Sequence, residues 1–125
     1  MGRIHTVAIP VTTTGSAGSA TGSGVSDALN GYIIDVYFDF HASTPATTDT
    51  TLAYTLRGGN IVVVTDSATD VLVAPRQKYV DNANSAITNS NGRFAVDGTL
   101  TVSLAQADAL TNAVIAYVRI EDSLP

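Results

Sequence analysis

The segment GYIIDVYFDF, residues 31–40, carries the clearest secondary-structure signal in the chain. Apolar side chains fill every second position, and the two aspartates fall between them. A period of two is typical of a β-strand with one buried face. We therefore predict a strand with one set of side chains in the core and the other toward solvent. The first set is Tyr32, Ile34, Val36, Phe38 and Phe40, and the second is Ile33, Asp35, Tyr37 and Asp39.

Working outward, several other segments also have the texture of strands. Residues 113–121 are apolar on both faces until their end, which is typical of a central strand. Residues 51–65 alternate on both sides of Gly58-Gly59-Asn60, which predicts a β-hairpin. Shorter strands are expected at 71–74, 93–97 and 99–104, and AQADALTN, residues 105–112, could form one helical turn.

Composition supports an all-β fold. The 125 residues are 45% hydrophobic and 14% charged, which favours a globular chain of one domain. Thr and Ala occur 17 times each and Glu only once, so the residues that favour helical bundles are scarce. We predict an antiparallel β-sandwich, jelly-roll-like, with about eight short strands.

Charge and cysteine content exclude several classes of function. The formal net charge of -5 has the wrong sign for neutralising phosphates, so we expect no nucleic-acid partner and no anionic membrane partner. With no cysteine, thiol catalysis and disulfides are impossible. No apolar run has the length of a membrane span or a signal peptide, which predicts a soluble protein made in the cytoplasm.

The first 24 residues differ in character from the rest. Residues 4–11 read as an edge strand or arm, because Pro10 cannot donate to a sheet ladder. Residues 12–24, TTTGSAGSATGSG, offer almost no side chain to bury, which suggested that a neighbour holds them in place. We therefore divide the chain into an arm, 1–24, and a sandwich domain, 25–125. The arm would contact a neighbouring subunit through Ile4, Val7 and Ile9.

Residues 75–92, PRQKYVDNANSAITNSNG, have no clear periodicity and are too long for a plain connection. Arg76, Lys78 and Tyr79 gather near the start of this segment, and Arg and Tyr are enriched at the energetic centres of interfaces. We predict a loop in which these three residues contact a neighbouring subunit.

No pattern of useful specificity indicates catalysis or a bound ion. His5 and His41 lie far apart in sequence, Asp35 and Asp39 are too widely spaced for one metal, and Asp66 and Asp70 suit turn chemistry. The glycines of residues 15–24 lack the spacing of a phosphate loop. We expect no catalytic residue, cofactor, metal or small-molecule substrate.

Five segments together resemble the small auxiliary structural proteins encoded among the head genes of tailed bacteriophages. In that group a strand ending in Pro-Arg precedes a long loop, as at Ala74-Pro75-Arg76, and a stretch like residues 98–107 precedes the last strand. The segments are MGRIHTVAIPV, GYIIDVYFDF, TLAYTLRGGNIVVVT, VLVAPRQKYVD and RFAVDGTLTVSLAQADALTNAVIAYVRIED.

The resemblance implies a β-sandwich virion component without enzyme activity, a decoration or cement protein on the outer capsid surface. Its expected partners are the major capsid protein and copies of itself, commonly as a homotrimer. Two alternatives stay open at this point. One is an adhesin, fibre or carbohydrate-binding module, and the other is a neck or tail protein of the virion. A small hydrolase is disfavoured because His, Glu and Cys are scarce.

Overall fold

The computed structural model describes residues 3–122, together with all side chains of that range except those of residues 89 and 90. The described chain forms eleven strands and no helix. The strands are β1 (Ile4–Val11), β2 (Ala20–Val25), β3 (Leu29–Phe40), β4 (Asp49–Tyr54), β5 (Asn60–Val64), β6 (Val71–Val73), β7 (Gln77–Val80), β8 (Ala86–Gly92), β9 (Ala95–Gly98), β10 (Leu100–Ala107) and β11 (Val114–Asp122).

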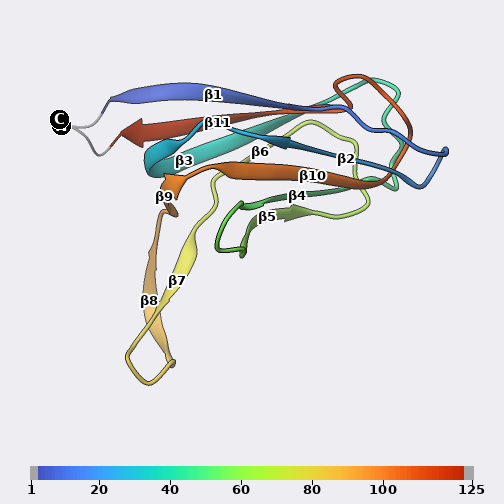
Figure 1. Cartoon of the computed structure of the whole chain (residues 1–125). Coiled ribbons are helices and arrows are strands. Elements are labelled where there is room, and N and C mark those ends of the chain that lie inside the picture. The colour runs from blue at the N-terminus through green and yellow to red at the C-terminus, as the bar shows by residue number, and fades with distance from the viewer. Residues whose placement is uncertain (1–2, 123–125) are drawn as a thin grey trace.

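Two antiparallel sheets lie face to face, and a separate hairpin projects from one end (Figure 1). The five-stranded sheet has the order β1-β11-β3-β6, with β9 also paired to β3, and the four-stranded sheet has the order β2-β10-β4-β5. The hairpin consists of β7 and β8. The all-β, antiparallel, sandwich-like fold is therefore confirmed. β11 is a central strand between β1 and β3, as its sequence predicted.

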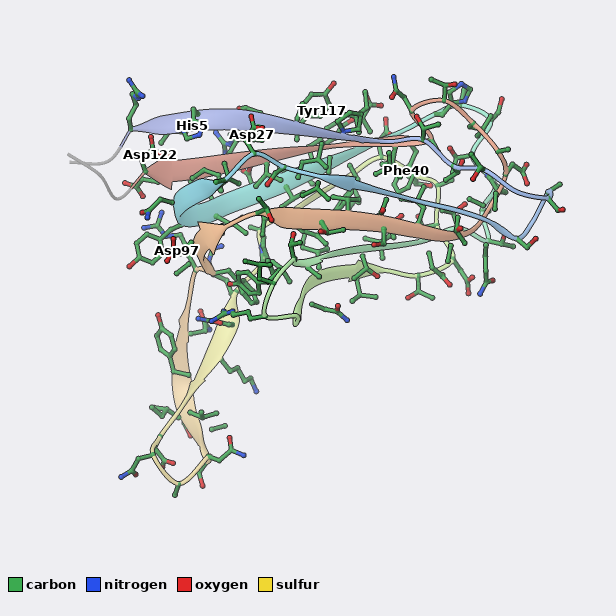
Figure 2. All side chains as sticks on the ribbon, in the orientation of Figure 1. His5, Asp27, Phe40, Asp97, Tyr117 and Asp122 are labelled. Atoms are coloured by element: carbon green, nitrogen blue, oxygen red, sulfur yellow. The ribbon has the colours of Figure 1, made fainter. Side chains whose placement is uncertain are left out.

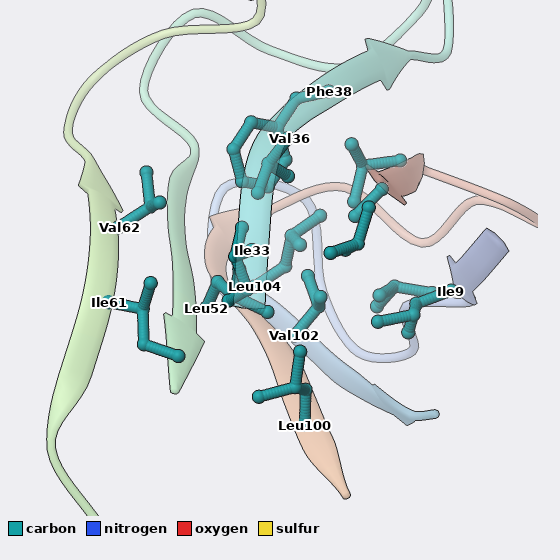
Figure 3. Packing of buried hydrophobic residues seen from close by; sticks show 14 of the residues in the cluster. Ile9, Ile33, Val36, Phe38, Leu52, Ile61, Val62, Leu100, Val102 and Leu104 are labelled. Atoms are coloured by element: carbon teal, nitrogen blue, oxygen red, sulfur yellow. The ribbon is translucent and has the colours of Figure 1, made fainter. Parts of the chain in front are cut away.

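The core fills the space between the two sheets (Figure 3). Its largest members are completely shielded from solvent, and burial of each such side chain stabilises the fold by about 1.5–3 kcal/mol. Those contributed by the five-stranded sheet include Phe38, Ile9, Ile33 and Ile120, and those contributed by the four-stranded sheet include Leu52, Leu100 and Val102.

A β-bulge in β3 corrects the predicted face assignment. Arg119 pairs with Asp35 but Ile120 pairs with Ile33, so Ile34 is skipped in the ladder. The extra residue changes which side chains point inward, because a slip of one residue exchanges the faces of a strand. As a result Ile33 is fully buried and Tyr32 is exposed, opposite to the prediction, whereas Val36, Phe38 and Phe40 are buried as expected.

The Gly/Ser/Thr segment is ordered by contacts within the chain, so its order no longer argues for a neighbour. β2 pairs with β10, and the buried Thr13 hydroxyl bonds the backbone of Asp108 and Leu110. A Cβ added at Gly24 would lie 2.2 Å from the carbonyl oxygen of Pro10. Glycine thus lets β2 approach β1 closely and closes this side of the sandwich.

Two further local predictions have different outcomes. The hairpin predicted at 51–65 is present as β4 and β5, although residues 55–57 belong to its turn and Leu56 is almost fully exposed. The helical turn predicted at 105–112 is absent from the described chain, because β10 continues to Ala107. Gln106 takes a positive φ of 53° there, where the register with β2 shifts.

Candidate interaction surface

The segment predicted as a loop, 75–92, is a projecting hairpin formed by β7 and β8. Gln77 pairs with Gly92 at its base and Val80 with Ala86 near its tip. At the tip, the Asp81 carboxylate accepts bonds from the backbone N–H groups of Ala83 and Ser85. The segment was predicted as a loop because its many Asn and Ser residues favour turns over strands. The hairpin extends away from both sheets (Figure 1).

The projecting hairpin exposes apolar side chains instead of packing them on the sandwich. Tyr79, Val80 and Ile87 are all exposed, Val80 at 52%. The Tyr79 ring lies over Gly92, where an added Cβ would come within 2.0 Å of its hydroxyl oxygen. A two-stranded hairpin without a covering layer is marginally stable in water. This element therefore has more apolar surface than its own fold covers.

The predicted contact residues Arg76, Lys78 and Tyr79 all belong to this hairpin or its base. The Arg76 guanidinium donates to the carbonyl oxygen of Pro75 at 2.8 Å, next to the start of β7. Lys78 is exposed and makes no ion pair within residues 3–122. Neither Arg76 nor Lys78 forms an ion pair in the described chain, but backbone carbonyl oxygens hold the Arg76 guanidinium in place.

A second exposed surface crosses the outer face of the five-stranded sheet. Ala8 pairs with Tyr117, Tyr117 with Tyr37, and Tyr37 with Leu72, so the four side chains form one row across β1, β11, β3 and β6. We call these four residues the aromatic row. Leu72 is 62% exposed and Tyr37 38%. Tyr117 points away from the four-stranded sheet (Figure 2).

Carboxylates without cationic partners adjoin the aromatic row. Asp39 follows Tyr37 by two residues on the same face of β3. Asp70 accepts hydrogen bonds from the Phe40 N–H and, at 3.3 Å, from the Tyr37 hydroxyl. Neither carboxylate forms an ion pair in the described part of the chain. Partial desolvation, and then the nearby charges of Asp70 and Asp39, raise the pKa of Tyr37 above 10.0. The side of the aromatic row that faces the C-terminal end of β3 is therefore electronegative.

On the other side of the row, toward the N-terminal end of β3, an ion pair neutralises the charge. Arg119 Nε donates to Asp35 Oδ1 at 2.8 Å, and its second nitrogen donates to the other carboxylate oxygen at 2.5 Å. The hydrogen bonds from Arg119 hold the pKa of Asp35 below 3.8, and the charge of Arg76 adds to the effect. Asp35 is thus a buried structural carboxylate rather than the solvated one that the sequence predicted.

The edge strand β1 corrects the predicted arm contacts. β1 pairs with β11 over eight residues and lies at the edge of its sheet. Ile9 is completely buried in the core of its own chain and Val7 packs against that core, so neither side chain faces a neighbour. Ile4 is 57% exposed and remains available. Pro10 is tolerated because this strand has a partner on one side only.

A cleft of about 580 Å³ lies beside the base of the projecting hairpin. Tyr32, Tyr54 and Arg57 are among its lining residues, with the Arg57 guanidinium 4.1 Å from the centre of the Tyr54 ring. The Tyr54 hydroxyl donates to the Ala95 carbonyl oxygen at 2.7 Å. This cleft could not be predicted from local sequence, because its residues come from β3, β4, β7, β9 and the β4–β5 turn.

The two histidines considered as catalytic groups or metal ligands do not come together in the structure. His5 Nδ1 lies 3.4 Å from a carboxylate oxygen of Asp122, whereas His41 Nδ1 accepts a bond from the Ser43 N–H. Within residues 3–122, no group of three or more potential ligands among His, Asp and Glu could hold a metal ion. The same residues include no helix that is long and apolar enough to cross a membrane.

Comparison of the chain with known protein families, with curated proteins and with solved structures found no match. The sequence located the hairpin through Arg76, Lys78 and Tyr79, but it missed the aromatic row. That row joins residues from four strands, and only the strand register brings them together.

Proposed function

We propose that the protein is a non-enzymatic virion structural protein that cements the outer face of a tailed-phage head. In this proposal it bridges copies of the major capsid protein and associates with copies of itself as a trimer. It is made in the host cytoplasm and acts by binding other proteins, without catalytic turnover. The proposal includes no nucleic acid, membrane or cofactor as a partner. The resemblance of its sequence to phage head auxiliary proteins supplies the virion setting.

The projecting hairpin is the observation that carries the proposal. Its exposed apolar side chains and the unpaired Lys78 are typical of a surface that a partner protein covers. A cement protein needs such elements, because it works by contacts that add to those of the shell. Many identical weak contacts on one particle then act together through avidity.

Protein counting on purified particles tests the virion assignment. Quantitative mass spectrometry of phage particles that encode this chain should find hundreds of copies per particle, because an icosahedral shell repeats each site many times. A count of about a dozen would indicate a neck protein instead, since a neck consists of single rings of subunits. Absence from the particles would overturn the proposal.

A hairpin replacement tests the binding element. Residues 78–91 are replaced by a two-glycine turn, which is feasible because Gln77 and Gly92 are paired neighbours. The variant should fold and fail to bind particles that lack their own copies of the protein. Leu56→Ser, at the other exposed turn of the same end, is the matched control and should bind normally. Normal binding by the replacement variant would exclude the hairpin.

Glycan binding is the second candidate function, and the cleft favours it. Two tyrosines, Arg57 and Asp97 line one open depression, and aromatic rings beside polar groups are suited to sugar rings. A glycan array separates the two functions. A specific signal that Tyr32→Ala removes would support the adhesin or carbohydrate-binding alternative, whereas no signal together with particle binding would support the cement protein.

A further inference from the structure

We propose that the aromatic row is the docking site for the projecting hairpin of a second copy of this chain. The proposal names the surfaces of the self-association that the proposed function includes, and it rests on that part of it. The hairpin inserts Val80 against Leu72 and Tyr37, and it places Lys78, two residues from Val80 on the same strand, near the carboxylates of Asp39 and Asp70.

Charge complementarity favours a second copy as the occupant. Residues 75–92 carry Arg76 and Lys78 against Asp81 alone, a formal charge of +1. The rest of the chain holds four basic residues against ten acidic ones, a formal charge of -6. The basic segment of one copy thus meets an acidic body in the next, and opposite potentials steer such an encounter.

Each of the two surfaces carries charges without an ion-pair partner in the described chain. Arg93 is already bound to Glu121, and Asp35 is bound to Arg119. Lys78 on the hairpin, and Asp39 and Asp70 beside the row, have no ion-pair partner in the range 3–122. A contact between copies would place Lys78 beside Asp39 and Asp70, which lie on the same side of Tyr37.

Apolar complementarity points the same way. The hairpin exposes Tyr79, Val80 and Ile87, and the row exposes Leu72 and Tyr37. Each surface includes an exposed tyrosine, and aromatic side chains contribute most at the centre of a contact. Docking would also give the hairpin the covering layer that a two-stranded element needs.

The orientation of the two surfaces requires contact between molecules. The aromatic row faces away from the four-stranded sheet, whereas the hairpin extends past that sheet on the opposite side (Figures 1 and 2). A hairpin cannot reach the row of its own chain in this arrangement. The resulting interface is head-to-tail, joining two different patches, and such interfaces form closed rings when the rotation between copies closes.

A charge exchange between two variants of the full chain tests the proposal. Lys78→Glu and Asp39→Lys should each weaken self-association about tenfold, measured by sedimentation velocity over a range of concentrations. Mixing the two variants should restore it, because an intact Lys78 then meets an intact Asp39 and the reversed charges also match. Asp27→Lys, at an exposed carboxylate between β2 and β3, is the control and should associate normally.

A cross-link provides a measurement that does not depend on affinity. The chain has no cysteine, so Val80→Cys on one copy and Leu72→Cys on another introduce the only thiols in the mixture. Mild oxidation should yield the mixed disulfide dimer. Val63→Cys, which is 56% exposed on the four-stranded sheet, replaces Leu72→Cys in the control and should yield none.

The outcomes separate this inference from the proposed function. A strictly monomeric wild type, a mixture that stays as weak as its components, or equal cross-linking at residue 63 would overturn the docking site. If the protein then still bound particles through its hairpin, the hairpin's partner would be the capsid, and the cementing role would stand without this contact between copies. Restored association in a protein absent from particles would leave the docking site intact and reject the virion role.

Discussion

At the scale of single residues, the ion pair between Asp35 and Arg119 makes stability depend on pH. Arg119 holds the pKa of Asp35 below 3.8 in the folded state, whereas the unfolded chain restores the ordinary value. The pair's contribution is therefore complete above pH 3.8 and is lost as the pH falls through the folded pKa. Asp35→Asn should be less stable than wild type at neutral pH.

The difference in unfolding free energy between wild type and Asp35→Asn should shrink as the pH drops below 3.8. Urea titrations at a series of pH values measure it, and effects of other carboxylates cancel in the difference. Asp27→Asn, at an exposed carboxylate, serves as the control. A difference that stayed constant over the whole series would show that the pair does not titrate as described.

Gly24 is a residue whose missing side chain is itself structural. In Gly24→Ala the new Cβ would meet the Pro10 carbonyl oxygen at 2.2 Å, and backbone atoms cannot rotate away. We expect the free energy of unfolding to fall by at least about 2 kcal/mol, as for other overpacked sites. Ser23→Ala, exposed on the same strand, should change it by less than about 0.5 kcal/mol in the same denaturant titration.

At the scale of elements, β1 is part of the sandwich and not a detachable arm. Deletion of residues 2–11 removes Ile9, whose large side chain is worth about 2–5 kcal/mol in a core, and all pairing along one edge of β11. Against a total stability of about 5–15 kcal/mol, we expect the cooperative thermal transition to disappear. Circular dichroism during heating would show this loss.

Ile4→Lys separates the exposed edge of β1 from its role in the core. Ile4 is exposed, so this variant should keep the wild-type melting temperature within a few degrees. If the edge contacts a neighbour, the same variant should bind particles more weakly. A truncated protein with a sharp transition would instead show that the core folds without β1.

The projecting hairpin should be the least protected element of the isolated protein. It lacks a second layer, and its side chains at 78–80 and 86–88 are exposed. In a dilute sample its amides should exchange much faster than those of β3 and β11, and they should slow as self-association increases. Hydrogen exchange followed by mass spectrometry measures both states. Protection that is already complete in a dilute monomer would contradict this picture.

At the scale of the whole molecule, the charge distribution sets which partners it can meet. The net charge is -5 although Arg76 and Lys78 gather at the hairpin, so the overall field repels phosphates. We expect no mobility shift of DNA or RNA at low micromolar protein and physiological salt. A steeply salt-dependent shift that Lys78→Glu removes would show that the hairpin acts as a separate nucleic-acid site.

Much of the fold could be inferred from residue order, because the relevant information is local. The alternation around Val36 and Phe38, the apolar run that ends in β11, and the turn at Gly58-Gly59 each report a strand or a reversal over a few residues. The same reasoning singled out Lys78 and Tyr79 as predicted contact residues, since an unusual stretch of sequence can be recognised without knowing its structure. It failed at residues 78–91, where Asn and Ser favour turns but pairing across the hairpin overrides that preference.

Features that join distant segments depended on the assembled sheets. The bulge at Ile34 that buries Ile33 follows from the pairing of β3 with β11, and no local pattern fixes such a register. Ile9 reads like any exposed edge residue until the opposite sheet covers it, and the aromatic row exists only because four strands align their outward side chains. Periodicity records which residues share a face of one strand, whereas the neighbours of that face are set by pairing and packing between strands.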